Sequence, residues 1–337
     1  MHFLLTGHTG FKGSWLTLLL KERGHTVSGF SLDVQPGSLF ATAEIADCLT
    51  EHVLGDIRNL PLVKSQFESI NPDVIIHLAA QSLVRESYRD PFKTFETNVI
   101  GTLNVLKSSQ KLKNLQAQLI VTTDKVYRDS IKIDAYVETD PLGGDDPYSA
   151  SKAMTDIATQ SWVKSFESVP TSIARAGNVI GGGDICEDRL IPDLVNSYSK
   201  DLAPQLRYPD ATRPWQHVLD CLNGYLTLIE YMLKDGTCGA WNFGPENSKS
   251  RTVAEVAEKS GELWGTNMAW KQTPGNHPKE SANLLLNSTK ARTQLGWSDK
   301  LSFEQSLQWT IQWYKNATQG KNSREETERN IHQFEQM

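Results

Sequence analysis

The glycine-rich stretch "HFLLTGHTGFKG" near the N-terminus constrains the fold more than any other part of this sequence. The apolar residues 2–6 predict a strand, and the pattern of residues 11–24 predicts a helix. Gly7, Gly10 and Gly13 therefore lie at the turn from strand to helix. Glycines let the backbone turn tightly there and approach a diphosphate, whose charge is favoured at a helix N-terminus. Their context predicts dinucleotide binding.

Strands and helices alternate through the first half of the chain. Further strands are predicted at residues 25–32, 52–56, 73–80 and 118–123, with helical stretches between them. The last two are nearly continuous apolar runs, as expected for strands that are buried on both faces. This alternation predicts an α/β fold of the Rossmann type, a doubly wound parallel sheet.

The amino-acid composition changes near residue 176, after which glycine, proline and tryptophan are more frequent. We predict a dinucleotide-binding domain at residues 1–175. Residues 176–317 would form mainly a smaller C-terminal α/β substrate-binding domain, with chain crossings back to the first. The charged tail at residues 318–337 is expected to be a solvated helix or a disordered end.

Composition excludes several classes of protein. A net charge of −6 and a pI near 5.8 argue against nucleic-acid and anionic-membrane binding. The N-terminal apolar run is too short for a signal peptide, and no stretch reaches transmembrane length. The four cysteines are scattered without a C-x-x-C pair, which favours reduced thiols over disulfides or a metal site. We therefore expect a cytoplasmic protein without a metal.

Two aspartates follow strands of the first half. Asp33 closes the second predicted strand, about twenty residues beyond the last glycine, where a carboxylate accepts hydrogen bonds from the ribose hydroxyls of NAD. The neighbouring residues include no arginine for the 2′-phosphate of NADP, so we favour NAD. A helix-cap or turn aspartate is the alternative for Asp33. Asp56 follows the third strand and could face the adenine amino group.

Tyr148 and Lys152 in "DDPYSASK" lie one helical turn apart, so both face the same side. A nearby ammonium lowers the pKa of a tyrosine, which then becomes a usable base for a hydroxyl proton. The pair alone is a common accident of sequence. Together with the glycine loop, "HLAAQ" and Thr123 at the end of the fifth strand, it resembles the extended short-chain dehydrogenase/reductase superfamily, which acts on nucleotide sugars.

Within that superfamily the chain is similar to the CDP-glucose 4,6-dehydratases. The most specific matching segments are "TGHTGFKGSW", "GNVIGGGD" with "DRLIPD", and "RPWQHV", and the matches extend from about residue 3 to residue 315. The resemblance implies NAD as cofactor and Tyr148 as catalytic base, with Lys152 lowering its pKa and binding the ribose. It also implies Thr123 as a partner of the sugar 4-hydroxyl.

The resemblance further assigns binding residues. Cofactor contacts are implied for Gly7, Gly10, Phe11, Gly13, Asp33, Asp56, Ile57, Ala79, Ala80, Gln81, Asn98, Tyr148 and Lys152. Substrate contacts are implied for Ser82, Asn178, Arg189, Arg213 and His217. The two arginines are the candidate clamps of the diphosphate, because a guanidinium pairs bidentately with phosphate oxygens.

The implied reaction needs one more acid and one more base than a simple dehydrogenase. Tyr148 takes the 4-hydroxyl proton while NAD⁺ accepts hydride from C4. The new ketone acidifies the C5 proton, water is lost across C5 and C6, and hydride returns to C6. In "VTTDKVY", Asp124 is the candidate acid at C6 and Lys125 the candidate base, or electrostatic assistant, at C5. These roles need a protonated Asp124 and a partly neutral Lys125, which burial would favour.

An ordinary structural role is the alternative for this pair, with Asp124 capping a turn and Lys125 solvated. Adjacent residues on an extended strand also point to opposite faces. Only an irregular backbone at the strand end would bring Asp124 and Lys125 to one sugar.

Other functions on the same fold remain open. One is a dehydratase for another nucleotide sugar, or a 4-epimerase, which needs no elimination pair. Another is a dinucleotide-sensing protein without catalysis, which should have lost Tyr148, Lys152 or Thr123. Two long helical segments resemble those that pair subunits in this superfamily, which implies a homodimer or a homotetramer.

Overall fold

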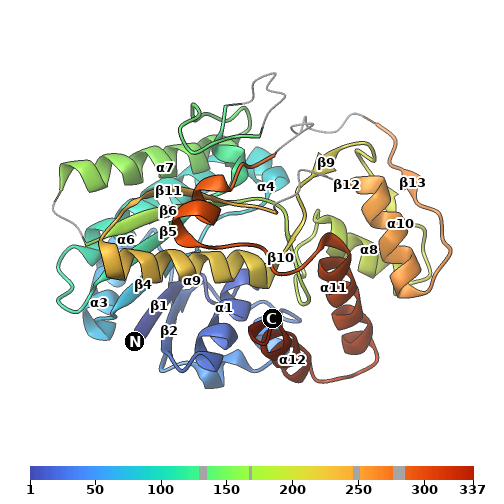
Figure 1. Ribbon diagram of the computed structural model, residues 1–337, viewed down its shortest axis with the longest axis horizontal. Coiled ribbons are helices and arrows are strands. Elements are labelled where there is room, and N and C mark those ends of the chain that lie inside the picture. Colours follow the sequence, from blue (N-terminus) through green and yellow to red (C-terminus); the bar gives the residue numbers. More distant parts are fainter. Residues whose placement is uncertain (129–134, 167–168, 246–250, 276–284) are drawn as a thin grey trace.

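A computed structural model describes residues 1–128, 135–166, 169–245, 251–275 and 285–337 (Figure 1). Its centre is a seven-stranded sheet in the order β11-β6-β5-β4-β1-β2-β3, and every neighbouring pair is parallel. The strands are β1 (His2–Thr6), β2 (Thr26–Ser31), β3 (Glu51–Leu54), β4 (Val74–His77), β5 (Ala117–Val121), β6 (Thr171–Ala176) and β11 (Gly239–Phe243). The predicted α/β fold with a doubly wound parallel sheet is confirmed.

The order of the strands reverses between β1 and β4, because β2 and β3 follow on one side and β5 and β6 on the other. Thr6 at the end of β1 pairs with Phe30 of β2 and with His77 of β4. The loops after β1 and β4 therefore meet at the carboxyl edge of the sheet. In sheets of this type, ligands bind in the crevice at that point.

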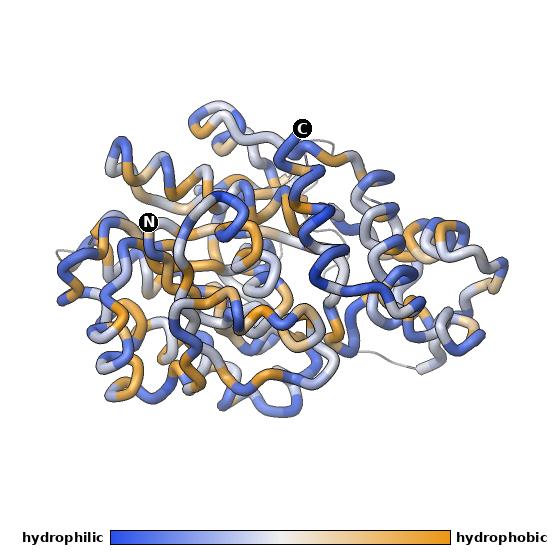
Figure 2. The backbone as a smooth tube through the Cα atoms, turned by 90° about the horizontal axis from the view of Figure 1, so that it is seen from below, coloured by the Kyte–Doolittle hydropathy of each residue, from blue (hydrophilic) through white to orange (hydrophobic). Residues whose placement is uncertain are grey.

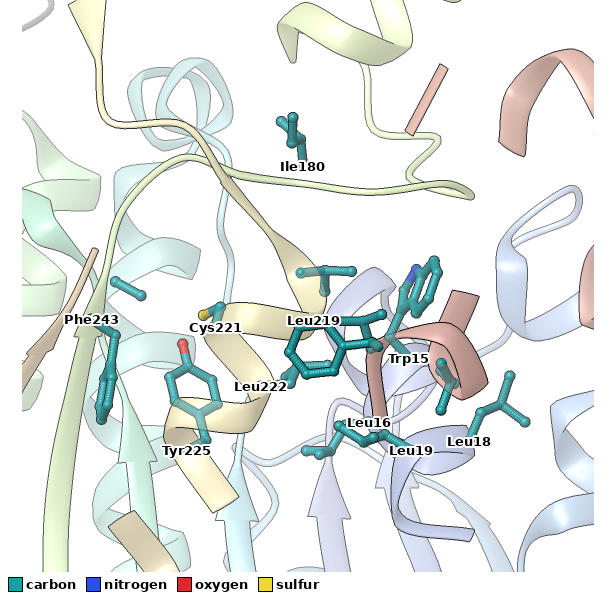
Figure 3. Packing of buried hydrophobic residues seen from close by; sticks show 14 of the residues in the cluster. Trp15, Leu16, Leu18, Leu19, Ile180, Leu219, Cys221, Leu222, Tyr225 and Phe243 are labelled. Atoms are coloured by element: carbon teal, nitrogen blue, oxygen red, sulfur yellow. The ribbon is translucent and has the colours of Figure 1, made fainter. Parts of the chain in front are cut away.

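Helices cover both faces of the sheet (Figure 1). The main ones are α1 (Phe11–Glu22), α3 (Leu60–Ile70), α6 (Gly101–Ser109), α7 (Pro147–Ser165) and α9 (Val218–Asp235). Successive strand residues alternate between the two layers, since Leu4 packs in one buried cluster and Leu5 in the other. Figure 3 shows the larger cluster, where α1 and α9 meet through residues such as Trp15, Leu219 and Leu222.

A second group of elements lies beside the carboxyl edge of the sheet (Figure 1). Its helices are α8 (Leu190–Tyr198), α10 (Val253–Trp264) and α11 (Phe303–Thr318), and its strands are β7 (Val179–Ile180), β8 (Gln205–Leu206), β9 (Thr212–Arg213), β10 (Gln216–His217), β12 (Arg251–Thr252) and β13 (Lys271–Gln272). Between them, β11 returns to the large sheet and pairs with β6. The boundary near residue 176 stays a prediction.

The remaining elements are short. They are α2 (Leu39–Thr42), η1 (Ile45–Cys48), α4 (Val84–Arg89), α5 (Pro91–Phe95), η2 (Glu96–Ile100), η3 (Asp124–Val126) and η4 (Ala291–Leu295). In the part of the chain that the structure describes, no helix is both long and apolar enough to cross a membrane.

The charged tail forms a helix, α12 (Ser323–Glu335), which is largely hydrophilic (Figure 2). The expectation of a solvated or disordered end is wrong for one of its faces. Ile331 and Phe334 are buried in the main core, and Thr327 accepts a hydrogen bond from Trp313. A few apolar residues at helical spacing are enough to dock such a helix, even where charged residues dominate its composition.

Candidate active site

A cleft of about 610 Å³ lies at the carboxyl edge of the sheet, where the strand order reverses. Its walls come from the glycine loop, the ends of β2, β4 and β5, the start of α7 and the segments that follow β6. Most of the residues predicted for catalysis and binding line it. These are Gly7, Gly10, Phe11, Gly13, Asp33, Asp56, Ile57, Ala79, Ala80, Ser82, Thr123, Asp124, Lys125, Tyr148, Lys152, Asn178, Arg189 and Arg213.

The glycine loop has no room for side chains at two of its three glycines. Gly7 has a φ of +76°, and a Cβ there would lie 2.7 Å from the backbone nitrogen of Ala79. A Cβ on Gly13 would lie 2.3 Å from the carbonyl oxygen of Gly7. Gly10 caps α1 without a side-chain hydrogen bond. Gly7 and Gly13 thus let the loop pack tightly against its own backbone and the segment after β4, and all three glycines line the cleft at the N-terminus of α1, where an anion is favoured.

Two carboxylates extend this part of the cleft. Asp33 is exposed directly beyond β2. Asp56 lies beyond β3, and the Arg58 guanidinium donates hydrogen bonds to both of its oxygens. These hydrogen bonds hold the pKa of Asp56 below its usual value. Ile57 is buried beneath, where a Cβ on Gly101 would lie 2.5 Å from its side chain.

Gln81 and Asn98 do not line the cleft but support its wall. The Asn98 side chain accepts a hydrogen bond from the Gln81 backbone at 2.8 Å and donates to Ser151 at 2.8 Å. The Gln81 amide donates to Thr94 and to the Leu83 carbonyl. The structure therefore gives both residues a supporting role in the wall of the cleft, and their expected contacts with the cofactor stay a prediction.

His217 is also a structural residue, and its expected contact with the substrate stays a prediction. It is fully buried and does not line the cleft. Its Nδ1 accepts a hydrogen bond from the Leu219 backbone and caps α9. Its ring packs edge-on against Trp15 and Trp309. Burial lowers the pKa of His217 to about 3, so the imidazole is neutral.

Arg189 and Arg213 both reach the cleft, as expected for diphosphate clamps. Arg189 donates to Asp184 at 2.7 Å and to the Ser82 hydroxyl at 3.1 Å. Arg213 is buried and donates to the carbonyl of Thr212. Asn178 also lines the cleft, and its buried Oδ1 has no hydrogen-bond partner among the described residues.

Asp124 and Lys125 share the cleft because the backbone is irregular at the end of β5. The strand stops at Val121, and Asp124–Val126 form a single 3₁₀ turn capped by Thr123. In such a turn, successive side chains are not held on opposite faces as they are in a strand. Lys125 Nζ lies 3.8 Å from Asp124 Oδ1, and the Thr123 hydroxyl donates to the same oxygen at 2.9 Å.

The other oxygen of Asp124 is buried without a hydrogen-bond partner in the described part of the structure. Asp124 itself is only 1% exposed. Room for its carboxyl group depends on Gly177, where a Cβ would lie 2.3 Å from Asp124 Oδ2. A buried carboxyl oxygen without a partner is costly and is a common mark of a functional site. Asp124 lines the cleft, so the chain keeps this carboxyl group at the candidate site at the expense of that cost.

Tyr148 and Lys152 project from the first turns of α7, which Asp146 caps. Burial raises the pKa of Tyr148 to about 12, although a hydrogen bond with Thr123 opposes the rise. The direction is opposite to the one expected from a neighbouring lysine. Burial, and next the charge of Lys12, lower the pKa of Lys152 to about 7. An ammonium that is only partly charged at neutral pH has less effect on the tyrosine than the sequence suggested.

The comparison with protein families matches residues 4–310 to the family described as GDP-mannose 4,6 dehydratase. The chain belongs to this family. It is 38% identical to CDP-glucose 4,6-dehydratase of Salmonella typhimurium over 94% of this chain and 91% of that protein. It is also 30% identical to UDP-glucose 4-epimerase of Halalkalibacterium halodurans, over 95% of this chain and 97% of that protein.

Solved structures agree on the fold. The dTDP-glucose 4,6-dehydratase of Bacillus anthracis, solved in complex with NAD, superimposes with a TM-score of 0.81 at 27% identity, covering 95% of this chain and 98% of that one. The UDP-glucose 4-epimerase of Thermotoga maritima, solved with UDP-glucose, gives a TM-score of 0.85 at 23% identity, covering 94% and 100%. Dehydratases of this family and epimerases thus share one architecture.

This dehydratase-family cleft also contains charged residues that sequence reasoning missed. Arg85 and Arg207 both donate to Asp188 Oδ1, at 2.6 and 2.8 Å, and all three line the cleft. Asp188 has a φ of +65°, a conformation that costs energy for a residue with a side chain. The matching segment "DRLIPD" was the available signal, but it pointed to Arg189. The described residues contain no group of three or more potential metal ligands.

Proposed function

We propose that this protein is an NAD-dependent CDP-glucose 4,6-dehydratase that forms CDP-4-keto-6-deoxyglucose. The observation that carries the proposal is the presence of Asp124 and Lys125 in the cleft that also holds Thr123, Tyr148 and Lys152. Tyr148, with Thr123 and Lys152, can remove the proton of a hydroxyl group. Asp124 and Lys125 can then eliminate water. The family match and the relative with 38% identity support this reaction and favour the cytidine nucleotide.

The residues around the glycine loop fit NAD. The three glycines line the cleft at the N-terminus of α1, which would favour a diphosphate, and Asp33 stands where a ribose would follow. An exposed carboxylate at that position accepts hydrogen bonds from ribose hydroxyls and repels a 2′-phosphate. Bound NAD would supply the exchange of hydride with the sugar, first at C4 and finally at C6.

The chain contributes the proton chemistry of the first step. Tyr148 would accept the proton of the sugar 4-hydroxyl, and Thr123, which is hydrogen-bonded to Tyr148, would orient that hydroxyl group. Burial makes the phenolate costly, so positive charge beside the ring must stabilise it as the proton arrives. Arg189 already acts on Tyr148 in this direction. We assign the same role to Lys152, which follows one helical turn along α7 and whose Nζ donates a 3.0 Å hydrogen bond to the carbonyl of Val121.

The second step is the loss of water, and we assign it to the two polar residues of the 3₁₀ turn, Asp124 and Lys125. Asp124 lines the cleft, and its Oδ2 has no hydrogen-bond partner among the described residues, so we assign Asp124 as the acid that gives a proton to the departing 6-hydroxyl group. Lys125 lies beside it and is more exposed, at 23% of its side-chain area. We assign Lys125 to the C5 proton as base or as electrostatic assistant. Arg189 and Arg213 would hold the diphosphate, with Ser82 and Asn178 near the sugar.

A 4-epimerase is the second candidate function, because one relative at 30% identity bears that name. An epimerase also oxidises C4, so Tyr148, Lys152 and Thr123 do not separate the two reactions. A buried acid with an unpaired oxygen has no role in epimerisation, and Asp124 therefore favours dehydration.

We also propose a homodimer, or a tetramer built from it, that works in the cytoplasm in deoxysugar and polysaccharide biosynthesis. Large apolar side chains are exposed on α4, α5, η2 and α7, and their burial against a second copy would be favourable. They are Tyr88, Phe92, Ile100, Met154 and Ile157. Small-angle scattering should give at least twice the mass of one chain, and a monomeric mass would contradict this assembly.

The reaction is tested by incubating the purified protein and NAD⁺ with CDP-glucose, UDP-glucose, GDP-mannose and dTDP-glucose in parallel. Mass spectrometry should show the loss of one water from CDP-glucose, with recovery of the oxidised cofactor. Conversion of a different nucleotide sugar would correct the substrate. Epimerised hexose without water loss would favour the second candidate function.

A further inference from the structure

A buried network joins three segments, of which two carry the proposed proton-transfer residues and the third is β6. Its centre is Arg175 on β6, which is 1% exposed. Its Nε and Nη2 donate to the two oxygens of Asp156 at 2.8 Å each. Asp156 is fully buried on α7, one helical turn beyond Lys152. A bidentate ion pair of this kind fixes α7 against the sheet.

The third segment is the turn that carries Asp124 and Lys125. Tyr127 follows this turn directly, and Arg175 Nη1 donates to its hydroxyl at 2.9 Å. The same hydroxyl donates to Asn242 Oδ1 on β11 at 2.6 Å. The ring of Tyr127 is stacked on Tyr136 with the centroids 4.8 Å apart. Tyr127 is 3% exposed, so it touches the network and not the cleft.

We infer that Tyr127 is a positioning residue for the elimination step. This inference rests on the proposed dehydratase function. Its hydroxyl anchors the end of a three-residue turn that has only one side-chain cap. Arg175 would stay in place without that hydroxyl, because Asp156 and the carbonyl of Glu138 still accept its hydrogen bonds. Loss of the hydroxyl therefore loosens the turn and leaves α7 fixed.

The substitution Tyr127→Phe removes the anchor of the turn and leaves the ion pair that fixes α7. We expect it to slow water loss about tenfold, because a small misplacement of an acid or base strongly reduces its effect, while oxidation at C4 keeps its rate. Reactions are quenched with borodeuteride, which labels every keto sugar, and mass spectrometry separates labelled hexose from labelled 6-deoxyhexose. The ratio of hexose to deoxyhexose should rise about tenfold in the variant.

Tyr198→Phe is the matched control. It removes the hydroxyl of another buried tyrosine, which donates to the Ala257 carbonyl and contacts neither the network nor the cleft. Its ratio should equal that of the unchanged protein. An unchanged ratio in Tyr127→Phe, or equal slowing of both steps, would overturn the inference. Absence of water loss from the unchanged protein would instead overturn the proposed function.

A second variant covers the case in which Tyr127→Phe fails to fold, which thermal unfolding would reveal. Asn242→Ala removes the acceptor of the Tyr127 hydroxyl from the β11 side. It should shift the ratio in the same direction by a smaller factor, since Arg175 still holds the hydroxyl group. An unchanged ratio in folded Asn242→Ala, with Tyr127→Phe unfolded, would also count against the inference.

Discussion

The two groups of proposed proton-transfer residues are built on very different scaffolds. Tyr148 and Lys152 stand on α7, a 19-residue helix with a capped N-terminus. Asp124 and Lys125 stand on a three-residue 3₁₀ turn at the end of a strand. A long helix sets the direction of its side chains by itself, whereas a single turn depends on its surroundings. The elimination residues should therefore be more sensitive to distant changes than the oxidation residues.

The comparison is tested most strongly by removing the base on the helix. Tyr148→Phe keeps the ring but removes the atom that we propose accepts the 4-hydroxyl proton, so we expect product formation to fall about 10³-fold or more. Borodeuteride quenching should trap neither the hexose nor the deoxyhexose. Tyr198→Phe is again the control, and a Tyr148→Phe rate within tenfold of normal would exclude Tyr148 as the base.

Removal of the acid on the turn should have a different signature. In the unchanged protein the Thr123 hydroxyl donates to Asp124 Oδ1, and Asp124→Asn keeps an oxygen that can accept this hydrogen bond. The amide, however, cannot release a proton to the leaving group. We expect water loss to fall about 10²-fold while C4 oxidation continues, so that labelled hexose accumulates in the quenched reaction. If the rate of C4 oxidation in Asp124→Asn falls as much as the rate of water loss, the residues on the turn and those on α7 do not serve separate steps.

The turn should also respond to a change outside it. Gly177→Ala would place a Cβ 2.3 Å from Asp124 Oδ2, so the acid must move or the strand must shift. We expect water loss about tenfold slower, with a stability cost of about 1–3 kcal/mol. Gly244→Ala is a fair control, because its Cβ would meet nothing nearer than 3.4 Å. Normal elimination by Gly177→Ala would show that the turn tolerates displacement.

Sequence reasoning succeeded where local geometry decides the outcome. The glycine loop and the Tyr148–Lys152 spacing follow from the chain itself, because a strand-turn-helix and a helical turn fix which groups share a side. It could not show where tertiary packing directs a polar side chain. His217, Gln81 and Asn98 do not line the cleft, and each makes hydrogen bonds with backbone groups, so their contacts with a ligand stay predictions.

The same limit applies to Asp124, Arg175 and the tail. The strand pattern gave no reason for the 3₁₀ turn, which exists because β5 ends at Val121. The network around Arg175 joins residues that are far apart in sequence, so no local spacing could signal it. The charged composition of α12 masked the two apolar residues that dock it, Ile331 and Phe334.

The smallest predicted effect concerns the stability of the helix group. The pKa of Lys152 falls from 10.5 to about 7 on folding, so between these values the unfolded chain binds more protons than the folded one. Stability then rises with pH across this interval, and the penalty for burying the ammonium is fully present below about pH 7.

Lys152→Met removes that penalty but also the hydrogen bond to Val121. We expect the variant to be more stable than the unchanged protein by about 1–2 kcal/mol at pH 6, with the difference shrinking towards pH 10. Urea unfolding of both proteins at several pH values measures this difference, and Lys125→Met is the control, because Lys125 is more exposed and on the turn. A difference that is constant with pH would mean that Lys152 stays charged in the folded protein, and that the helix supplies a full positive charge beside Tyr148.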